Sequence, residues 1–121
     1  FDFTELYNRL KSIIKFKFIF CNRILQNLIY SRKDFDGGLE SHTYKIVEFY
    51  KYINKKKKLI DTSDYIDLDY ENINIEKLND FLPFFTNIKE IYYRDFKIST
   101  KIIDNDSIKI INNILSTELN L

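Results

Sequence analysis

The most chemically suggestive stretch of the sequence is an acidic run in which carboxylates occupy alternate positions. Asp67, Asp69 and Glu71 are separated by one residue each, and Asp61 and Asp64 precede them. Carboxylate oxygens are the ligands of calcium, but an EF-hand loop also needs a Gly at its central turn and a Glu at its end. A loop counted from Asp61 or from Asp67 has neither, so we expect no metal site. Alternate carboxylates fit the exposed face of a β-strand.

Nucleophilic catalysis would depend on the single cysteine, Cys21, and the single histidine, His42. These two residues fall on different predicted elements and have no local signature of a catalytic pair. We expect Cys21 to be a buried thiol in a reducing, cytoplasmic compartment, and His42 to lie at the surface near a helix start. Gly37 and Gly38 lack the Lys-Ser/Thr of a phosphate-binding loop and predict a turn. We therefore expect no enzyme and no cofactor.

The length and composition describe one folded domain. The chain has 121 residues, of which 45% are hydrophobic and 31% charged, as in ordinary globular proteins. Its 20 Ile, 15 Lys and 12 Asn reflect the codon bias of an AT-rich genome. The longest apolar stretch, residues 18–21, is too short to cross a bilayer, so no membrane partner is expected.

Charge divides the chain into a basic and an acidic half. Residues 1–60 contain 13 Lys and Arg against 6 Asp and Glu, whereas residues 61–121 contain 6 against 12. Opposite net charges favour packing of the two halves against each other, although a basic half also suits an acidic partner or nucleic acid.

Helical spacing of apolar residues dominates the first half. It predicts a helix over residues 4–15 and a second helical period over residues 20–29, with either a break or a continuous helix between them. A third helix is expected to begin near Ser41. Its apolar stripe is made of Ile46, Phe49, Tyr50 and Ile53. Lysines after a helix complement its negative end and also offer contacts to phosphate. They are Lys55, Lys56, Lys57 and Lys58.

The second half alternates short apolar strands with short helices. Residues 66–68, 91–93 and 119–121 each read apolar-x-apolar, and they start 25 and then 28 residues apart. A helix is expected over residues 75–82 after the capping residue Asn74, and another over residues 108–115 after Asp106 or Ser107. A recurring period of this size indicates a repeat architecture.

Residues 82–93, Leu-Pro-Phe-Phe-Thr-Asn-Ile-Lys-Glu-Ile-Tyr-Tyr, resemble the junction between helix and strand in leucine-rich repeat proteins of the long-repeat, ribonuclease-inhibitor-like type. Ile88, Ile91, Tyr93 and Ile98 occupy the positions where that family places Leu. The resemblance covers about residues 62–121. It implies a solenoid of parallel strands and helices that binds another protein through its inner sheet face.

The expected fold is therefore α/β, with a basic helical cap over residues 1–60 followed by leucine-rich-repeat-like strand-helix units over residues 61–121, in what we expect to be part of a longer chain. In register, the strands would present an inner surface. It is made of Tyr65, Asp67, Asp69, Glu90, Tyr92, Arg94, Glu118 and Asn120. Tyr and Arg are frequent in binding hot spots, so Tyr92 and Arg94 are the expected anchors.

The function that this pattern favours is a non-enzymatic protein-protein interaction module. Two alternatives remain open. The first is a protein associated with RNA or a ribonucleoprotein, which would bind phosphate through the basic half and the run of four lysines. The second is an all-α bundle of the apoptosis-regulator type, because short apolar runs do not distinguish a strand from a buried helix segment.

Overall fold

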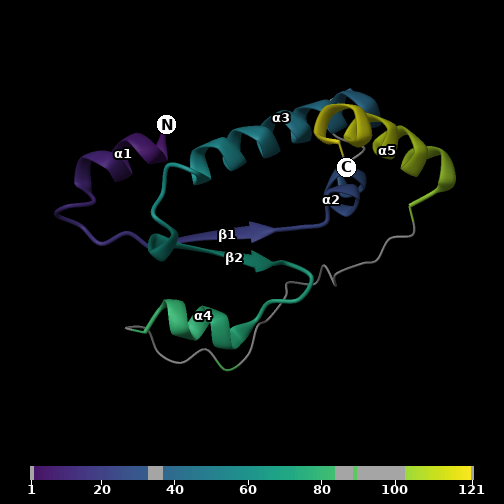
Figure 1. Cartoon of the computed structure of the whole chain (residues 1–121). Coiled ribbons are helices and arrows are strands. Elements are labelled where there is room, and N and C mark those ends of the chain that lie inside the picture. The colour runs from purple at the N-terminus through teal and green to yellow at the C-terminus, as the bar shows by residue number, and fades with distance from the viewer. Residues whose placement is uncertain (1, 33–36, 84–88, 90–102, 121) are drawn as a thin grey trace. The chain divides into compact units, whose positions relative to one another are not determined.

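The computed structural model describes residues 2–32, 37–83, 89 and 103–120, and the statements below concern these residues (Figure 1). They form five α-helices, one 3₁₀-helix and two parallel β-strands. In chain order the elements are α1 (Phe3–Leu10), β1 (Phe18–Asn22), α2 (Leu25–Ser31), α3 (Leu39–Lys57), η1 (Thr62–Asp64), β2 (Tyr65–Asp69), α4 (Ile75–Phe81) and α5 (Asn105–Leu119). The fold is mixed α/β, so the all-α alternative is wrong for the described part of the chain.

The chain divides into two compact units. The first unit comprises Phe1–Asn22 and Lys56–Ile98, and the second comprises Arg23–Lys55 and Ser99–Leu121. Each unit thus combines segments from both halves of the sequence, whereas the expected division lay at residue 60. Pairing of β1 with β2 is the reason, because it joins residues near the N-terminus to residues beyond position 60.

The first unit is built on a two-stranded parallel sheet. β2 contains residues 66–68, where a strand was predicted. β1 replaces the first part of the helix expected over residues 20–29. The helix α2 covers Leu25–Ser31, so it begins five residues later than expected and ends two residues later. Aromatic and β-branched residues favour extended chain when a neighbouring strand is available. That neighbour is β2: Phe18 pairs with Tyr65, and Asn22 with Asp69.

α1 covers one face of this sheet with aromatic side chains. The ring of Tyr7 lies 5.4 Å from Phe16 and 5.7 Å from Phe18, and Tyr7 is fully buried. α1 begins at Phe3, one residue before the predicted start, with Asp2 as its cap: Asp2 Oδ1 accepts a hydrogen bond from Thr4 N (3.0 Å). It ends at Leu10 and not at residue 15, because the chain then turns and extends so that Phe16 and Phe18 can reach Tyr7.

α4 packs on the opposite face of the sheet, below the strands in Figure 1. Its predicted cap is confirmed, since Asn74 Oδ1 accepts a hydrogen bond from Lys77 N (3.0 Å). Leu78 and Phe81 are buried. The sequence β2–turn–α4 therefore matches the strand-then-helix order that was expected from residue 66 onward.

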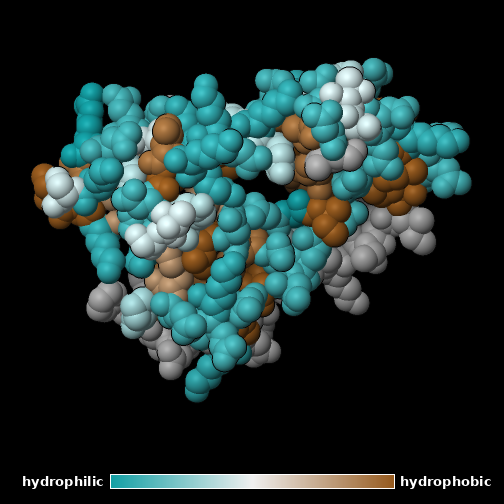
Figure 2. Space-filling model, viewed as in Figure 1, coloured by the Kyte–Doolittle hydropathy of each residue, from teal (hydrophilic) through white to brown (hydrophobic). Residues whose placement is uncertain are grey.

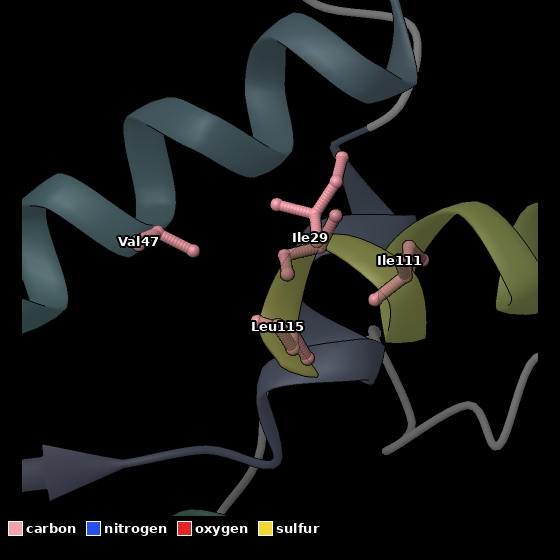
Figure 3. Packing of buried hydrophobic residues seen from close by; sticks show 5 residues of the cluster. Ile29, Val47, Ile111 and Leu115 are labelled. Carbon is pink, nitrogen blue, oxygen red and sulfur yellow. The ribbon is translucent and has the colours of Figure 1, made fainter. Parts of the chain in front are cut away.

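The second unit has a core of aliphatic side chains from three helices. Ile29 of α2, Val47 of α3 and Ile111 and Leu115 of α5 point toward one another (Figure 3). Leu119, at the end of α5, packs partly buried against this cluster. Three helices that each contribute one apolar stripe suffice to close a small core.

The third predicted strand, over residues 119–121, is wrong for its described residues. Leu119 ends α5, and Asn120 terminates the helix in the left-handed conformation with φ 57°. α5 also begins earlier than expected, because Asp104 and not Asp106 or Ser107 caps it: Asp104 Oδ2 accepts a hydrogen bond from Ser107 N (3.0 Å). Residue 119 is helical and not extended because Ile111, Leu115 and Leu119 lie at helical spacing and all pack into the core of the second unit.

Candidate functional site

The predicted inner face begins with three side chains on one side of β2. Alternation along a strand places Tyr65, Asp67 and Asp69 on the same face. Asp69 is exposed, whereas Tyr65 and Asp67 are half-buried. The Phe20 ring of β1 lies edge-on to Tyr65 at 5.7 Å. Of these three side chains, only that of Asp69, at the end of the strand, is exposed to solvent.

Asp67 is the centre of a polar network on this face. Its Oδ1 accepts hydrogen bonds from Lys57 Nζ (2.6 Å) and Asn22 Nδ2 (3.0 Å). Its backbone carbonyl accepts a third from Lys77 Nζ (2.7 Å). Partial burial opposes ionisation, but the hydrogen bonds from Lys57 and Asn22 outweigh it and lower the pKa of the Asp67 carboxyl. The carboxylate is thus compensated within the protein.

The four lysines predicted to contact phosphate divide into two pairs. Lys56 Nζ lies 2.9 Å from Asp2 Oδ2 and Lys57 Nζ lies 2.6 Å from Asp67 Oδ1, so both neutralise carboxylates of the first unit. Lys55 and Lys58 are exposed. Hydrogen bonds from Thr4 and then from Lys56 lower the pKa of Asp2. The lysine run therefore serves in part to attach the end of α3 to α1 and β2.

The remaining predicted face residues either lie outside the described residues or belong to a helix and its end. Glu90, Tyr92 and Arg94 lie outside the described residues. Glu118 lies on α5 in the second unit, and its Oε2 accepts a hydrogen bond from Lys51 Nζ (3.2 Å). Asn120 is the C-cap residue of the same helix. Glu118 and Asn120 therefore belong to a helix end and not to a strand.

A shallow open depression of about 500 Å³ lies between β2 and α4. It is lined by Ile66, Asn74, Glu76, Lys77, Asp80 and Phe81. Lys77 is engaged with the Asp67 carbonyl, and Asn74 caps α4. The lining thus consists largely of groups that already stabilise the first unit.

Cys21 and His42 occupy environments opposite to those expected. Cys21 is exposed, because alternation on β1 turns it away from the aromatic cluster. Desolvation, followed by the charge of Glu71, raises the pKa of its thiol, which disfavours the nucleophilic thiolate. His42 is 6% exposed, and neither ring nitrogen has a hydrogen-bond partner among the described residues.

The two residues considered for nucleophilic catalysis fall in different units of the chain. Cys21 belongs to the first unit and His42 to the second. Across residues 2–32, 37–83, 89 and 103–120, no three His, Cys, Asp or Glu side chains converge on a common point. None of the helices described is both long and apolar enough to cross a membrane.

An aromatic surface on α3 escaped the sequence prediction. Phe49 and Tyr50 were assigned to the buried stripe, yet Phe49 is 62% exposed and Tyr50 is exposed too. His42, Thr43 and Val47 are the buried residues of this helix. The signal in the sequence was the spacing of the aromatic residues on α3, which at 3.6 residues per turn do not all fall on one face of a helix.

Three exposed rings form what we call the aromatic face: Tyr44, Phe49 and Tyr52. Tyr44 and Tyr52 lie two turns apart on one side of the helix, and Phe49 adjoins Tyr52 at the i, i+3 spacing. Glu48 lies between the two tyrosines with its side chain exposed, and its carboxylate is 4.0 Å from Lys51 Nζ. The face combines aromatic area with a central negative charge.

In comparisons with known proteins, no family model, no curated protein and no solved structure matches the chain.

Proposed function

We propose that this chain is a non-enzymatic protein-interaction module whose binding surface is the aromatic face of α3. The observation that carries the proposal is the exposure of Phe49, together with Tyr44 and Tyr52, on a helix whose other face is buried in a core. Aromatic side chains are enriched at the centres of protein interfaces because they bury a large area at a small cost in conformational entropy.

The charge of the aromatic face favours a protein over RNA. Exposed rings between lysines can stack on unpaired bases, and Lys45 and Lys55 flank this face. Glu48, however, lies between Tyr44 and Tyr52, and because its exposed pair with Lys51 is weak in water, its carboxylate would repel a phosphate backbone. In addition, Lys56 and Lys57 are paired with carboxylates. The partner we infer is a protein with an apolar patch that accepts the rings and a basic group that meets Glu48.

We further propose that β2 and α4 form the first strand-helix unit of a leucine-rich-repeat-like solenoid. Parallel pairing of β1 with β2 and the cap of α4 at Asn74 support this proposal. Hydrogen exchange tests it, because a third strand over residues 91–93 would protect the amides of those residues. Exchange at the rate of an unstructured chain would contradict the solenoid.

Site-specific crosslinking tests the proposed binding surface. A photoreactive phenylalanine analogue is placed at Phe49 and, as a matched control, at the exposed Lys109 of α5. In extract treated with ribonuclease, we expect a discrete protein adduct from position 49 and none from position 109. An adduct that forms only in untreated extract would support the RNA alternative. Equal adducts from both positions would overturn the proposal.

Substitution provides the quantitative test once the adduct is identified. Phe49→Ser and Tyr52→Ser should each weaken binding of that partner by about tenfold or more, as expected for hot-spot residues. Lys109→Ser should leave the affinity unchanged. Far-UV circular dichroism of each variant checks that α3 remains folded, and unchanged affinity in a folded Phe49→Ser variant would contradict the proposal.

A further inference from the structure

The turn that connects α1 to β1 presents two isoleucines to solvent. Ile13 is 79% exposed and Ile14 is 48% exposed, and no other large hydrophobic residue in the described chain is as exposed as Ile13. The turn lies at the left edge of Figure 1, and hydrophobic surface is visible at the same place in Figure 2. Burying these adjacent aliphatic side chains against a partner would remove apolar surface from water, which is favourable.

The two ends of this turn are held in place. The amides of Ile13 and Ile14 both donate to the carbonyl of Leu10, at 2.9 and 2.7 Å. Tyr7 before the turn and Phe16 after it are in ring contact at 5.4 Å. The two exposed isoleucines therefore lie on a hydrogen-bonded turn whose flanking residues, Tyr7 and Phe16, are in ring contact.

Basic residues surround the two isoleucines, and acidic residues are absent over residues 6–17. The exposed basic residues are Arg9, Lys11, Lys15 and Lys17. Arg9 has an ion pair with Glu5 at 2.9 Å, but an exposed pair of this kind is weak in water. We call residues 9–17 the basic turn. Its surface is positive around an apolar tip.

We propose that the basic turn binds the surface of a lipid bilayer that contains anionic lipids. Ile13 and Ile14 would enter the boundary between headgroups and acyl chains, while the lysines contact lipid phosphates and carboxylates. A protruding apolar tip needs a matching pocket in a protein partner, whereas a lipid interface accepts it without one. Surface binding requires no apolar stretch that spans the bilayer, so the short apolar runs of the sequence do not oppose it.

Sedimentation with vesicles tests the proposal on the full chain. We expect binding to vesicles of phosphatidylcholine mixed with phosphatidylserine and little binding to phosphatidylcholine alone. Lys11→Gln and Lys15→Gln should each weaken binding about fivefold, and Ile13→Ser with Ile14→Ser at least about tenfold. The matched controls are Lys45→Gln with Lys109→Gln for charge and Ile110→Ser for an exposed isoleucine of the second unit; they should leave binding unchanged.

Fluorescence distinguishes insertion from attraction between charges alone. The chain contains no tryptophan, so an Ile13→Trp variant carries a single reporter at the tip. Its emission should shift to the blue when phosphatidylserine vesicles are added, while that of an Ile110→Trp variant should not. Polyglutamate, a soluble acidic polymer, should produce no shift.

Three results would overturn the proposal. They are equal loss of vesicle binding in the control variants, no shift for Ile13→Trp on phosphatidylserine vesicles, and binding to polyglutamate as strong as to the vesicles. The last result would favour an acidic protein partner. Because the basic turn belongs to the first unit and the aromatic face to the second, either proposal can fail while the other stands.

Discussion

Lys57, in the last turn of α3, donates a hydrogen bond of 2.6 Å to Oδ1 of Asp67 in the middle of β2. The ammonium group also lies 4.9 Å from the centre of the Phe20 ring. The lysine run and the acidic run each suggest an external ligand when the sequence is considered alone. Within the first unit they meet, and part of the charge of each is used to hold the last two residues of α3 against Asp2 and Asp67.

The Lys57–Asp67 pair should contribute measurably to stability. Its side chains are 17% and 40% exposed, so solvent screens the interaction in part and we expect a coupling free energy of about 1 kcal/mol. A double-mutant cycle with Lys57→Met and Asp67→Asn, followed by urea unfolding, measures it. Lys58→Met, at an exposed position of the same run, is the control. Equal effects of Lys57→Met and Lys58→Met would show that the pair contributes nothing.

Asp67 should make the protein more stable at neutral pH than in acid. Its pKa in the folded protein lies below the ordinary value of 3.8, so the unfolded chain takes up the proton first as the pH falls. The contribution is complete above the unfolded pKa and is lost as the pH falls through the folded pKa. The stability difference between wild type and Asp67→Asn should therefore shrink in acid; a difference independent of pH would contradict this assignment.

Tyr7 should be a key polar residue of the first unit. Its hydroxyl donates to Asp64 Oδ2 (2.6 Å) and accepts from Asp61 N (3.2 Å), and the hydrogen bond to Asp64, together with burial, raises the pKa of Tyr7 to about 12. Tyr7→Phe removes both hydrogen bonds while keeping the ring. We expect thermal and urea unfolding to show a clear loss of stability. Tyr44→Phe, on the exposed face of α3, should be neutral, and equal effects of the two would refute the prediction.

His42 should be a source of instability in the second unit. Burying a polar group without a hydrogen bond is unfavourable, and both ring nitrogens of His42 lack a partner in the described structure. His42→Leu should raise the free energy of unfolding by about 1 kcal/mol. His42→Gln, which keeps polar atoms at this site, should not. Destabilisation by His42→Leu would indicate that the imidazole has a polar role.

Ile110 and Ile111 provide a matched test of the second core. The residues are adjacent on α5, but Ile111 is fully buried and Ile110 is exposed. Ile111→Ala should cost about 3 kcal/mol through lost burial and the cavity that remains. Ile110→Ala should change stability by less than about 1 kcal/mol. Chemical denaturation of the two variants measures both values, and similar costs would mean that α5 is packed differently.

Local interactions made several elements predictable. The strand at residues 66–68 and the start of α4 follow from alternating apolar residues and from a cap at Asn74 that acts within one helical turn. Gly37 and Gly38 adopt φ values of 82° and 95°, which fits the predicted turn because glycine accepts the left-handed region without strain.

Longer-range contacts decided the remainder. Phe18–Asn22 becomes a strand because β2, far along the chain, pairs with it. Leu119 stays helical because the second core buries α5, although three residues of apolar-x-apolar sequence fit a strand equally well. The sequence by itself determined where apolar stripes and caps occur. Only the tertiary structure decided which of these stripes are buried and which residues, such as Phe49 and Ile13, remain exposed. The reason is that burial depends on neighbours that the local sequence does not specify.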